Sequence, residues 1–196
     1  MRLYLAEIKD VKPEHINQIN AERRKKIERY KLEDDKKRCV LGGLLMRDFL
    51  GDTEVYEDEN GKPLARNGVC FNLSHSGEYV AFAMSDYQVG CDIEKPRIVP
   101  YEKMGKFVFC ENEMDKIKNS PEKMGEFFRL WTKKEALLKC MGDGFHRPPK
   151  SVDVSKDTFE ENGKVYRFQT IEFSDYVISL CTMGEDFAKE IEFVKY

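Results

Sequence analysis

Two short apolar segments that begin alike constrain the fold of this chain more than any other feature. Residues 78–85 read Glu-Tyr-Val-Ala-Phe-Ala-Met-Ser, and residues 175–182 read Asp-Tyr-Val-Ile-Ser-Leu-Cys-Thr. Each segment follows a turn and is rich in strand-forming residues, which is typical of the second strand of a β-hairpin. A helix is predicted before each hairpin. We therefore predict an α+β fold of two similar helix-plus-β-hairpin halves in a pseudo-twofold arrangement.

The first half is predicted to contain its helices before its hairpin. Apolar residues at 40, 41, 44, 45 and 49 share one helical face, and Gly51 ends that helix. The tip of the hairpin is predicted at residues 72–77. The expected elements are a strand over 1–8, helices over 14–30 and 32–50, a polar loop over 54–67, hairpin strands over 69–73 and 79–85, and a strand over 88–94.

The second half is predicted to repeat this order. Residues 101–123 are charged and partly helical, and Pro121 can open a helix over 122–140 that Met141-Gly-Asp-Gly144 closes. Strands over 164–173 and 176–182 form the second hairpin. No long linker separates the halves, so we expect residues 1–88 and 89–196 to form one compact unit with a cleft between them.

Composition narrows the class of protein. The 196 residues are 41% hydrophobic and 35% charged, as in a globular protein with a polar surface. The net charge of -3 argues against a nucleic-acid binder, although a local basic patch would be hidden in that sum. Six scattered cysteines, no signal-peptide pattern and no apolar run of about 20 residues predict a cytoplasmic protein with free thiols and no membrane span.

An acidic pair ends the strand predicted over 88–94. Asp92 and Glu94 are two residues apart and therefore point to the same face of a strand. Two adjacent carboxylates repel each other unless a cation joins them, and oxygen ligands of this kind suit Mg²⁺. Such pairs are also common on solvated strands, so the pair alone does not establish a metal site.

A mixed stripe runs along the helix predicted over 122–140. Trp131, Glu135 and Lys139 lie four residues apart and share one face. A Glu–Lys pair of this spacing is usually a surface ion pair. The tryptophan on the same stripe favours a face turned toward the protein, with Glu135 partly buried.

Several segments are candidates for binding phosphate. A hydroxyl, an imidazole and turn amides at Ser74 and His75 can hold phosphate oxygens, although the segment also reads as an ordinary turn with an idle histidine. A Ser–His nucleophile pair is disfavoured because adjacent residues seldom align for proton transfer. Basic clusters at 23–26 and 36–38, and Lys62 before Pro63, could converge on a polyanion or remain solvated.

Four motifs in this order resemble the Sfp-type 4′-phosphopantetheinyl transferases. They are Gly61-Lys-Pro63, Asn72-Leu-Ser-His-Ser-Gly77, Gly90-Cys-Asp-Ile-Glu94 and Trp131-Thr-Lys-Lys-Glu-Ala-Leu-Leu-Lys139. Each motif is weak alone, and the four together are specific. The resemblance implies a Mg²⁺-dependent enzyme that moves the phosphopantetheine arm of coenzyme A onto a serine of an apo acyl or peptidyl carrier protein and releases adenosine 3′,5′-bisphosphate. It also implies that coenzyme A binds between the two halves.

The resemblance assigns a role to each matching residue. Asp92, Glu94 and Glu135 would hold the metal, Glu135 would also act as general base on the carrier serine, and Lys139 would assist the leaving group. Asp92, Glu135 and Lys139 thus form the catalytic set and also contact coenzyme A. The residues implied to bind its phosphates are Arg23, Lys26, Arg38, Lys62, Ser74 and His75.

Two residues depart from the family pattern, and three alternative functions compete with this interpretation. Cys39 stands where relatives carry a hydroxyl residue, and Cys91 stands where an aliphatic residue is commoner. The rivals are the smaller trimeric holo-acyl-carrier-protein synthase type, a non-catalytic coenzyme A or nucleotide-binding module, and a nucleic-acid binder. The repeated helix-plus-hairpin order disfavours the trimeric synthase type, and we expect a monomer. The presence of Asp92, Glu94, Glu135 and Lys139 disfavours a non-catalytic binding module. The negative net charge disfavours a nucleic-acid binder.

Overall fold

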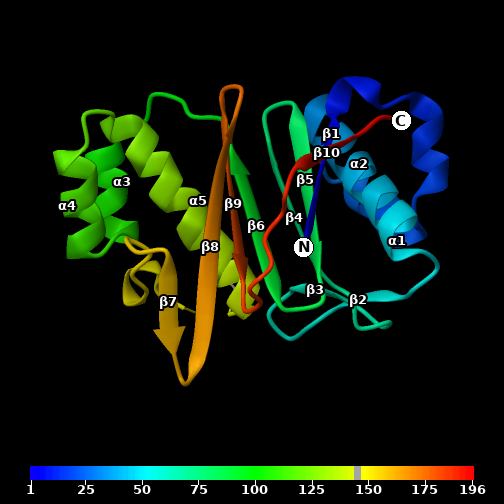
Figure 1. The fold of residues 1–196 in the computed structure, drawn as a ribbon. Coiled ribbons are helices and arrows are strands. Elements are labelled where there is room, and N and C mark those ends of the chain that lie inside the picture. The colour runs from blue at the N-terminus through cyan, green and yellow to red at the C-terminus, as the bar shows by residue number, and fades with distance from the viewer. Residues whose placement is uncertain (144–146) are drawn as a thin grey trace.

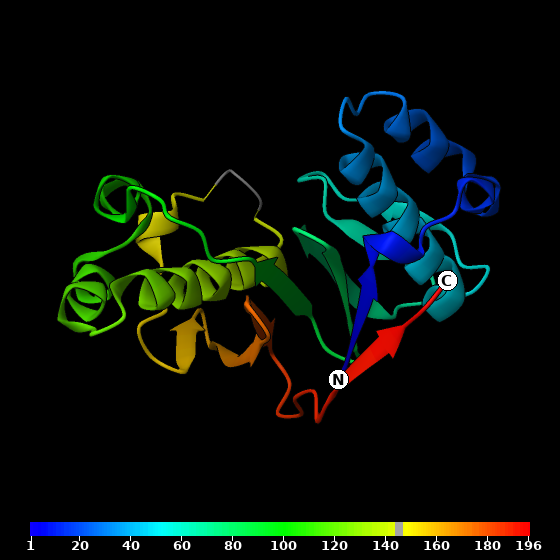
Figure 2. The same cartoon turned by 90° about the horizontal axis from the view of Figure 1, so that it is seen from above.

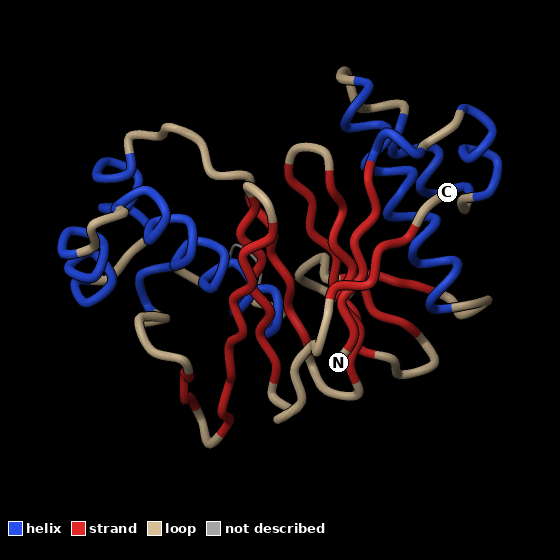
Figure 3. Tube along the Cα trace, turned by 45° about the horizontal axis from the view of Figure 1, so that its top comes forward, coloured by secondary structure: helices blue, strands red, loops and turns tan. Residues whose placement is uncertain are grey.

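The protein is arranged in four layers, with two sheets in the middle and helices on both outer sides (Figure 1). The structure is a computed structural model that describes residues 1–143 and 147–196. Each of the two main sheets has four strands. Figure 3 shows the strands gathered at the centre and the helices at the two flanks. This is the α+β class that the sequence predicts.

The first sheet has the strand order β10-β1-β5-β4. Its strands and helices are β1 (Arg2–Glu7), β4 (Cys70–Ser76), β5 (Tyr79–Ser85), β10 (Ile191–Val194), α1 (Ala21–Ile27) and α2 (Glu33–Leu50), with 3-10 turns at Ile8–Asp10 and Pro13–Gln18. A small hairpin of β2 (Val55–Glu57) and β3 (Pro63–Ala65) lies apart from this sheet. Strand β10 pairs in parallel with β1, so the end of the chain returns beside its beginning (Figure 2).

The second sheet has the strand order β6-β9-β8-β7. Its elements are β6 (Val89–Glu94), β7 (Thr158–Glu161), β8 (Lys164–Phe173), β9 (Tyr176–Thr182), α3 (Tyr101–Val108), α4 (Glu111–Asn119) and α5 (Lys123–Met141), with a 3-10 turn at Pro149–Ser151. Gly142 adopts a left-handed conformation after α5, as the predicted helix end requires. Gly144, the last residue of that predicted end, lies outside the described residues.

Three sequence predictions about local structure are wrong. The polar loop predicted over 54–67 contains the paired strands β2 and β3. The helix predicted over 14–30 is interrupted, because the Asn20 side chain accepts a hydrogen bond from the Arg23 backbone N–H at 2.8 Å and starts α1 anew. The hairpin tip predicted over 72–77 is mostly strand, since β4 continues to Ser76 and the turn is confined to Gly77 and Glu78. The prediction mistook turn-forming residue types for a turn, although pairing with β5 keeps them extended.

Strands β5 and β9 are largely apolar because both of their faces are buried. On β5, Phe82 faces the core under α2, whereas Ala81 and Ala83 face the core between the two sheets. On β9, Val177 faces the core under α5, and Ile178 faces the core between the sheets. Strands that bury both faces lose the apolar–polar alternation that marks a half-exposed strand.

The two acid-Tyr-Val segments meet where the sheets touch. The rings of Tyr79 and Tyr176 lie 5.1 Å apart in an edge-to-face arrangement. The Lys95 ammonium pairs with Glu78 at 3.1 Å and with Asp175 at 3.2 Å. Corresponding residues of the repeat thus contact one another across the centre of the molecule, as a twofold relation between the halves would require. The pseudo-twofold itself stays a prediction.

Gly90 allows the backbone of α5 to pack directly against β6. A Cβ atom at Gly90 would lie 1.9 Å from the Ala136 carbonyl oxygen and 2.6 Å from the Cys140 nitrogen. Both neighbours are helix backbone and cannot rotate away. We expect Gly90→Ala to lower the free energy of unfolding by about 3 kcal/mol, at the upper end of overpacking costs. Urea unfolding measures this loss of stability. Gly163→Ala is the control, because a Cβ atom at Gly163 meets no atom within 4 Å, so any loss there reflects only the positive φ angle of that turn.

Candidate functional site

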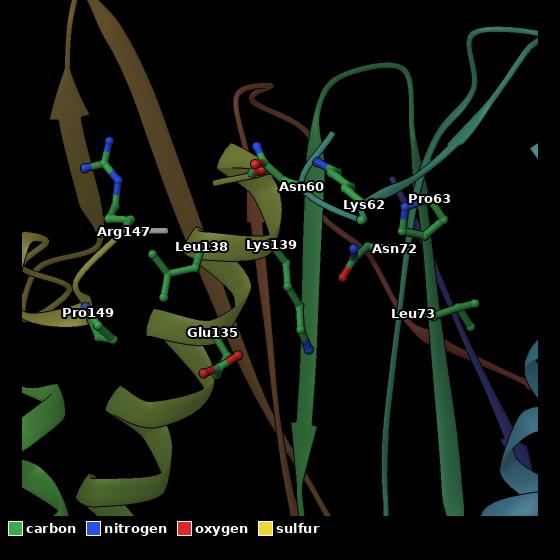
Figure 4. A pocket seen from close by; sticks show the side chains of 12 residues that line it. Asn60, Lys62, Pro63, Asn72, Leu73, Glu135, Leu138, Lys139, Arg147 and Pro149 are labelled. Atoms are coloured by element: carbon green, nitrogen blue, oxygen red, sulfur yellow. The ribbon is translucent and has the colours of Figure 1, made fainter. Parts of the chain in front are cut away.

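A cleft of about 330 Å³ opens between α5 and the β3–β4 side of the molecule. Its walls include Lys62, Asn72, Leu73, Glu135, Lys139 and Pro149. Figure 4 shows Glu135 and Lys139 on one side of the cleft, with Lys62, Asn72 and Leu73 across from them. The predicted catalytic helix therefore faces the first half of the chain across a cavity of ligand-binding size.

Asp92 lies on β6, where it contacts Lys139, and is almost fully buried. Its Oδ1 accepts hydrogen bonds from Lys139 Nζ at 2.6 Å and Ser74 Oγ at 2.8 Å. Its Oδ2 is buried and has no hydrogen-bond partner among the residues that the structure describes. A buried carboxylate oxygen without a donor is costly, so this atom is available for a cation.

Glu94 lies two residues further along β6 and is more accessible. Its Oε2 accepts hydrogen bonds from Ser76 Oγ at 3.0 Å and Arg97 Nη1 at 3.2 Å. The side chain of Glu94 is 20% exposed. Asp92 and Glu94 are thus held in the same way, each by one serine and one cation on a single oxygen.

Glu135 and Lys139 occupy one face of α5, as the stripe predicts. Burial raises the pKa of Glu135, and although Lys139 opposes this shift, Asp92 and Glu94 add to it. Burial acts to lower the pKa of Lys139, but the adjacent Asp92 outweighs it and the pKa is raised. The lysine therefore stays charged, and Glu135 is a half-buried carboxyl with increased proton affinity, as a general base requires.

The three predicted metal ligands do not form a closed cluster in this structure. Within residues 1–143 and 147–196, the one set of three metal-binding side chains with ligand atoms all within 4.8 Å is Cys110, Glu113 and Asp153. Glu113 is fully buried and already paired with Lys134, so that set is an ion-pair network. The carboxylates of Asp92, Glu94 and Glu135 lie further apart than this, and Lys139 and Arg97 pair with the first two.

The chemistry of these three acids nevertheless fits a divalent cation. All three are oxygen donors, and Asp92 offers a buried oxygen that lacks a partner. Burial is the main cause of the raised pKa of Glu135, and the negative charges of Asp92 and Glu94 add to it. A hard cation beside phosphate prefers such a set, with water completing its shell.

A second, smaller cavity of about 180 Å³ brings together four of the six predicted phosphate-binding residues. Arg23, Lys26, Arg38 and His75 all line it. Arg38 is held by the Gly77 carbonyl oxygen at 2.6 Å, and Arg23 by that of Cys39 at 2.9 Å. Asp35 also lines the cavity and pairs with Arg38 at 2.6 Å, but the four basic side chains outnumber it and favour an anion.

This environment favours the neutral form of His75. Partial burial lowers its pKa, and the positive charges of Arg38 and Lys139 lower it further. An anion bound beside it would reverse the electrostatic part of that shift and favour the imidazolium.

The other two predicted phosphate-binding residues, Ser74 and Lys62, do not line this second cavity. Ser74 is buried and faces Asp92 and Lys139, so it does not share the cavity of His75. The Lys62 ammonium donates to Gln88 Oε1 and to the Cys140 carbonyl oxygen, both at 3.0 Å, at the end of α5. Lys62 therefore borders the cleft from the loop that caps the catalytic helix.

Sequence reasoning missed residues that complete the site. Arg147 lines the cleft and is fixed by Glu161 at 2.9 Å and 2.8 Å, but no motif marks it. Ser76 also went unassigned, although the alternation of Asn72, Ser74 and Ser76 could have shown that the three share one face of a strand.

Among residues 1–143 and 147–196, no helix combines the length and the apolar character needed to cross a bilayer.

Comparison with known proteins gives a consistent result across most of the chain. Residues 88–181 match the model of the 4′-phosphopantetheinyl transferase superfamily, and residues 12–86 match that of the 4′-phosphopantetheinyl transferase N-terminal region. The 4′-phosphopantetheinyl transferase gsp of Aneurinibacillus migulanus is 32% identical over 84% of this chain and 76% of its own length. The 4′-phosphopantetheinyl transferase Sfp of Bacillus subtilis (strain 168) is 28% identical over 91% and 88%.

A solved structure also shows similarity. The holo-[acyl-carrier-protein] synthase of Thermotoga maritima matches with a TM-score of 0.39 and 18% identity, over 48% of this chain and 61% of that one.

Proposed function

The chain belongs to the 4′-phosphopantetheinyl transferase family, and from this premise we propose that it transfers the 4′-phosphopantetheine group of coenzyme A to a serine of an apo carrier protein. The observation that carries the proposal is that Glu135 and Lys139 line one cleft and that Lys139 pairs with the buried Asp92 at 2.6 Å. These groups come from β6 and α5. A binding module without turnover has no use for a half-buried base beside a charged lysine.

The reaction requires activation of the attacking serine hydroxyl and stabilisation of the leaving group. A serine hydroxyl is a poor nucleophile, and Glu135 at the cleft wall would accept its proton. Lys139, kept charged by Asp92, would stabilise or protonate the departing adenosine 3′,5′-bisphosphate. Asp92, Glu94 and Glu135 would hold Mg²⁺, which when bound neutralises charge on the diphosphate.

We extend the proposal to coenzyme A and to the two halves. The cavity formed by Arg23, Lys26, Arg38 and His75 would take the nucleotide phosphates, and Lys62 would face the diphosphate from the cleft. Residues 1–88 would thus bind the nucleotide, and most of the chemistry would belong to residues 89–196. The protein would act as a monomer.

The test is a mass measurement of the carrier. The protein is incubated with coenzyme A, Mg²⁺ and an apo acyl or peptidyl carrier protein, and the carrier is weighed by mass spectrometry. A phosphopantetheine-sized gain that a chelator abolishes is the expected result. Coenzyme A binding without a gain for any class of carrier would instead indicate a non-catalytic module.

His75 is expected to act on binding rather than on turnover. Loss of a hydrogen bond to a charged group costs about 1.5–3 kcal/mol, so His75→Ala should raise the KM for coenzyme A about 10-fold and leave kcat nearly unchanged. Dephospho-coenzyme A, which lacks the 3′-phosphate, is the control: its KM should be the same for both proteins.

The lowered pKa of His75 also predicts a pH dependence. Burial and the nearby cations favour the neutral imidazole in the free protein, and a bound phosphate would favour its protonated form, so the wild-type KM for coenzyme A should fall as the pH is lowered from 8 toward 6. His75→Ala should lose that dependence. A KM that rises in this range would contradict the assignment.

A further inference from the structure

The two sheets are joined between β4 and β6 by side chains rather than by a backbone ladder. Strands β4 and β6 belong to separate sheets. Three side chains of β4 accept hydrogen bonds from backbone N–H groups of β6 and of the residue that follows it: Asn72 from Cys91 at 2.9 Å, Ser74 from Ile93 at 3.3 Å, and Ser76 from Lys95 at 3.1 Å. The period of two along each strand makes the three contacts regular. We call this set the serine seam.

Ser74 and Ser76 of the seam also donate a hydrogen bond to a carboxylate. A hydroxyl has one proton to donate, and because each Oγ already accepts from a backbone N–H, that proton is free for a carboxylate. Ser74 donates it to Asp92 Oδ1 at 2.8 Å, and Ser76 donates it to Glu94 Oε2 at 3.0 Å. Each serine therefore joins the first half of the chain to one of the acids on β6.

Asp92 and Glu94 have the same hydrogen-bonding arrangement. In each, the serine and a cation share one oxygen: Lys139 lies 2.6 Å from Asp92 Oδ1, and Arg97 lies 3.2 Å from Glu94 Oε2. Asp92 Oδ2 has no hydrogen-bond partner, and across the described ranges 1–143 and 147–196 none contacts Glu94 Oε1 either. One oxygen of each carboxylate fixes the side chain, and the other remains open.

We propose that Ser76 is a positioning residue that holds Glu94 by Oε2 and so presents Oε1 to a divalent cation, in parallel with Ser74 and Asp92. The inference rests on the proposed function, since it concerns the metal site of that reaction. Groups that orient a metal-binding side chain typically contribute 10- to 100-fold to metal affinity or activity. Because Ser76 belongs to β4, it also couples the relative position of the two halves to the geometry of the acids.

The experiment measures Mn²⁺ binding to the full chain in the presence of coenzyme A, by electron paramagnetic resonance of free Mn²⁺. Ser76→Ala should weaken Mn²⁺ binding by about 10-fold or more. Ser76→Thr, which keeps the hydroxyl, should stay within about threefold. Ser85→Ala is the matched control, because Ser85 Oγ accepts from the Tyr87 backbone N–H and contacts no carboxylate. Coenzyme A affinity without metal should be the same in all variants.

A double-mutant cycle separates orientation from general damage to the fold. If Ser76 acts through Glu94, then Ser76→Ala should have little further effect on Mn²⁺ binding in a Glu94→Gln background. A full additional loss in that background would overturn the inference. If Ser76→Ala does not fold, Ser76→Cys takes its place, since it keeps the shape and has a weaker donor.

The possible failures are distinguishable. Wild-type protein that binds Mn²⁺ and modifies the carrier, together with Ser76→Ala binding within twofold of it, would overturn only the role of Ser76. Wild-type protein that neither binds Mn²⁺ with coenzyme A nor modifies any carrier would overturn the proposed function, and this inference with it.

Discussion

Glu135→Ala and Asp92→Ala are each expected to lower kcat about 10²-fold or more, the cost of removing one preorganised electrostatic group. Without Glu135, none of the described residues that line the cleft offers a carboxyl to accept the proton of the carrier serine. Without Asp92, the charge that raises the pKa of Lys139 is lost. Single-turnover transfer to the carrier, followed by mass spectrometry at saturating Mg²⁺ and coenzyme A, measures both effects.

Both variants should remain folded. Glu135 lies at the wall of a cleft, so its truncation opens that space to water. Asp92→Ala leaves Lys139 without its counter-ion, but that side chain is 28% exposed and can be solvated. Glu190→Ala, which removes an exposed carboxylate before β10, is the control for net charge. Near-normal turnover of Glu135→Ala or Asp92→Ala with ample Mg²⁺ would show that the assigned role is wrong.

The parts of the site that follow from a helical or strand period were predictable from sequence. The spacing of Glu135 and Lys139 places them on one face of α5, and the structure confirms that they line one cleft. The spacing of Asp92 and Glu94 predicts one face of β6, and both side chains reach across to β4. These arguments succeed because a local period is set by the backbone alone.

The serine contacts could not be predicted in the same way. Ser76 meets Glu94 across 18 positions of sequence, and the alignment of β4 with β6 depends on how two separate sheets pack. The short strands β7 and β10 were missed for a related reason. β10 is held by its pairing with β1 nearly the whole length of the chain away, so its own few residues carry little evidence of a strand.

Lys134 is the clearest case of a residue whose role the sequence concealed. It stands beside Glu135 in a charged stretch, and lysine is almost never fully buried unless it is paired. In the structure its side chain is 1% exposed, and its partner Glu113 is completely buried. The partner lies on α4, and nothing in the local pattern of either helix links the two.

Lys134→Met is expected to lower the free energy of unfolding by about 3–5 kcal/mol, because removal of one partner leaves a buried charge uncompensated. Lys134 Nζ donates to Glu113 Oε2 at 2.7 Å and to the carbonyl oxygens of Pro149 and Val152 at 2.9 Å and 2.8 Å. Burial lowers the pKa of Lys134 although Glu113 opposes the shift, so the ammonium depends on these acceptors. Urea unfolding monitored by Trp131 fluorescence gives the value.

Lys118→Met provides the contrast, because Lys118 pairs with Asp115 on the surface at 3.2 Å with both side chains more than half exposed. That substitution should change stability by less than about 1 kcal/mol. A similarly small loss for Lys134→Met would contradict the buried-charge argument. The effect should also reach the cleft, since Lys134 holds the Pro149 carbonyl and Pro149 lines the wall facing Glu135. A variant that still folds should therefore show a raised KM for coenzyme A, which ties the stability of this ion pair to the shape of the site.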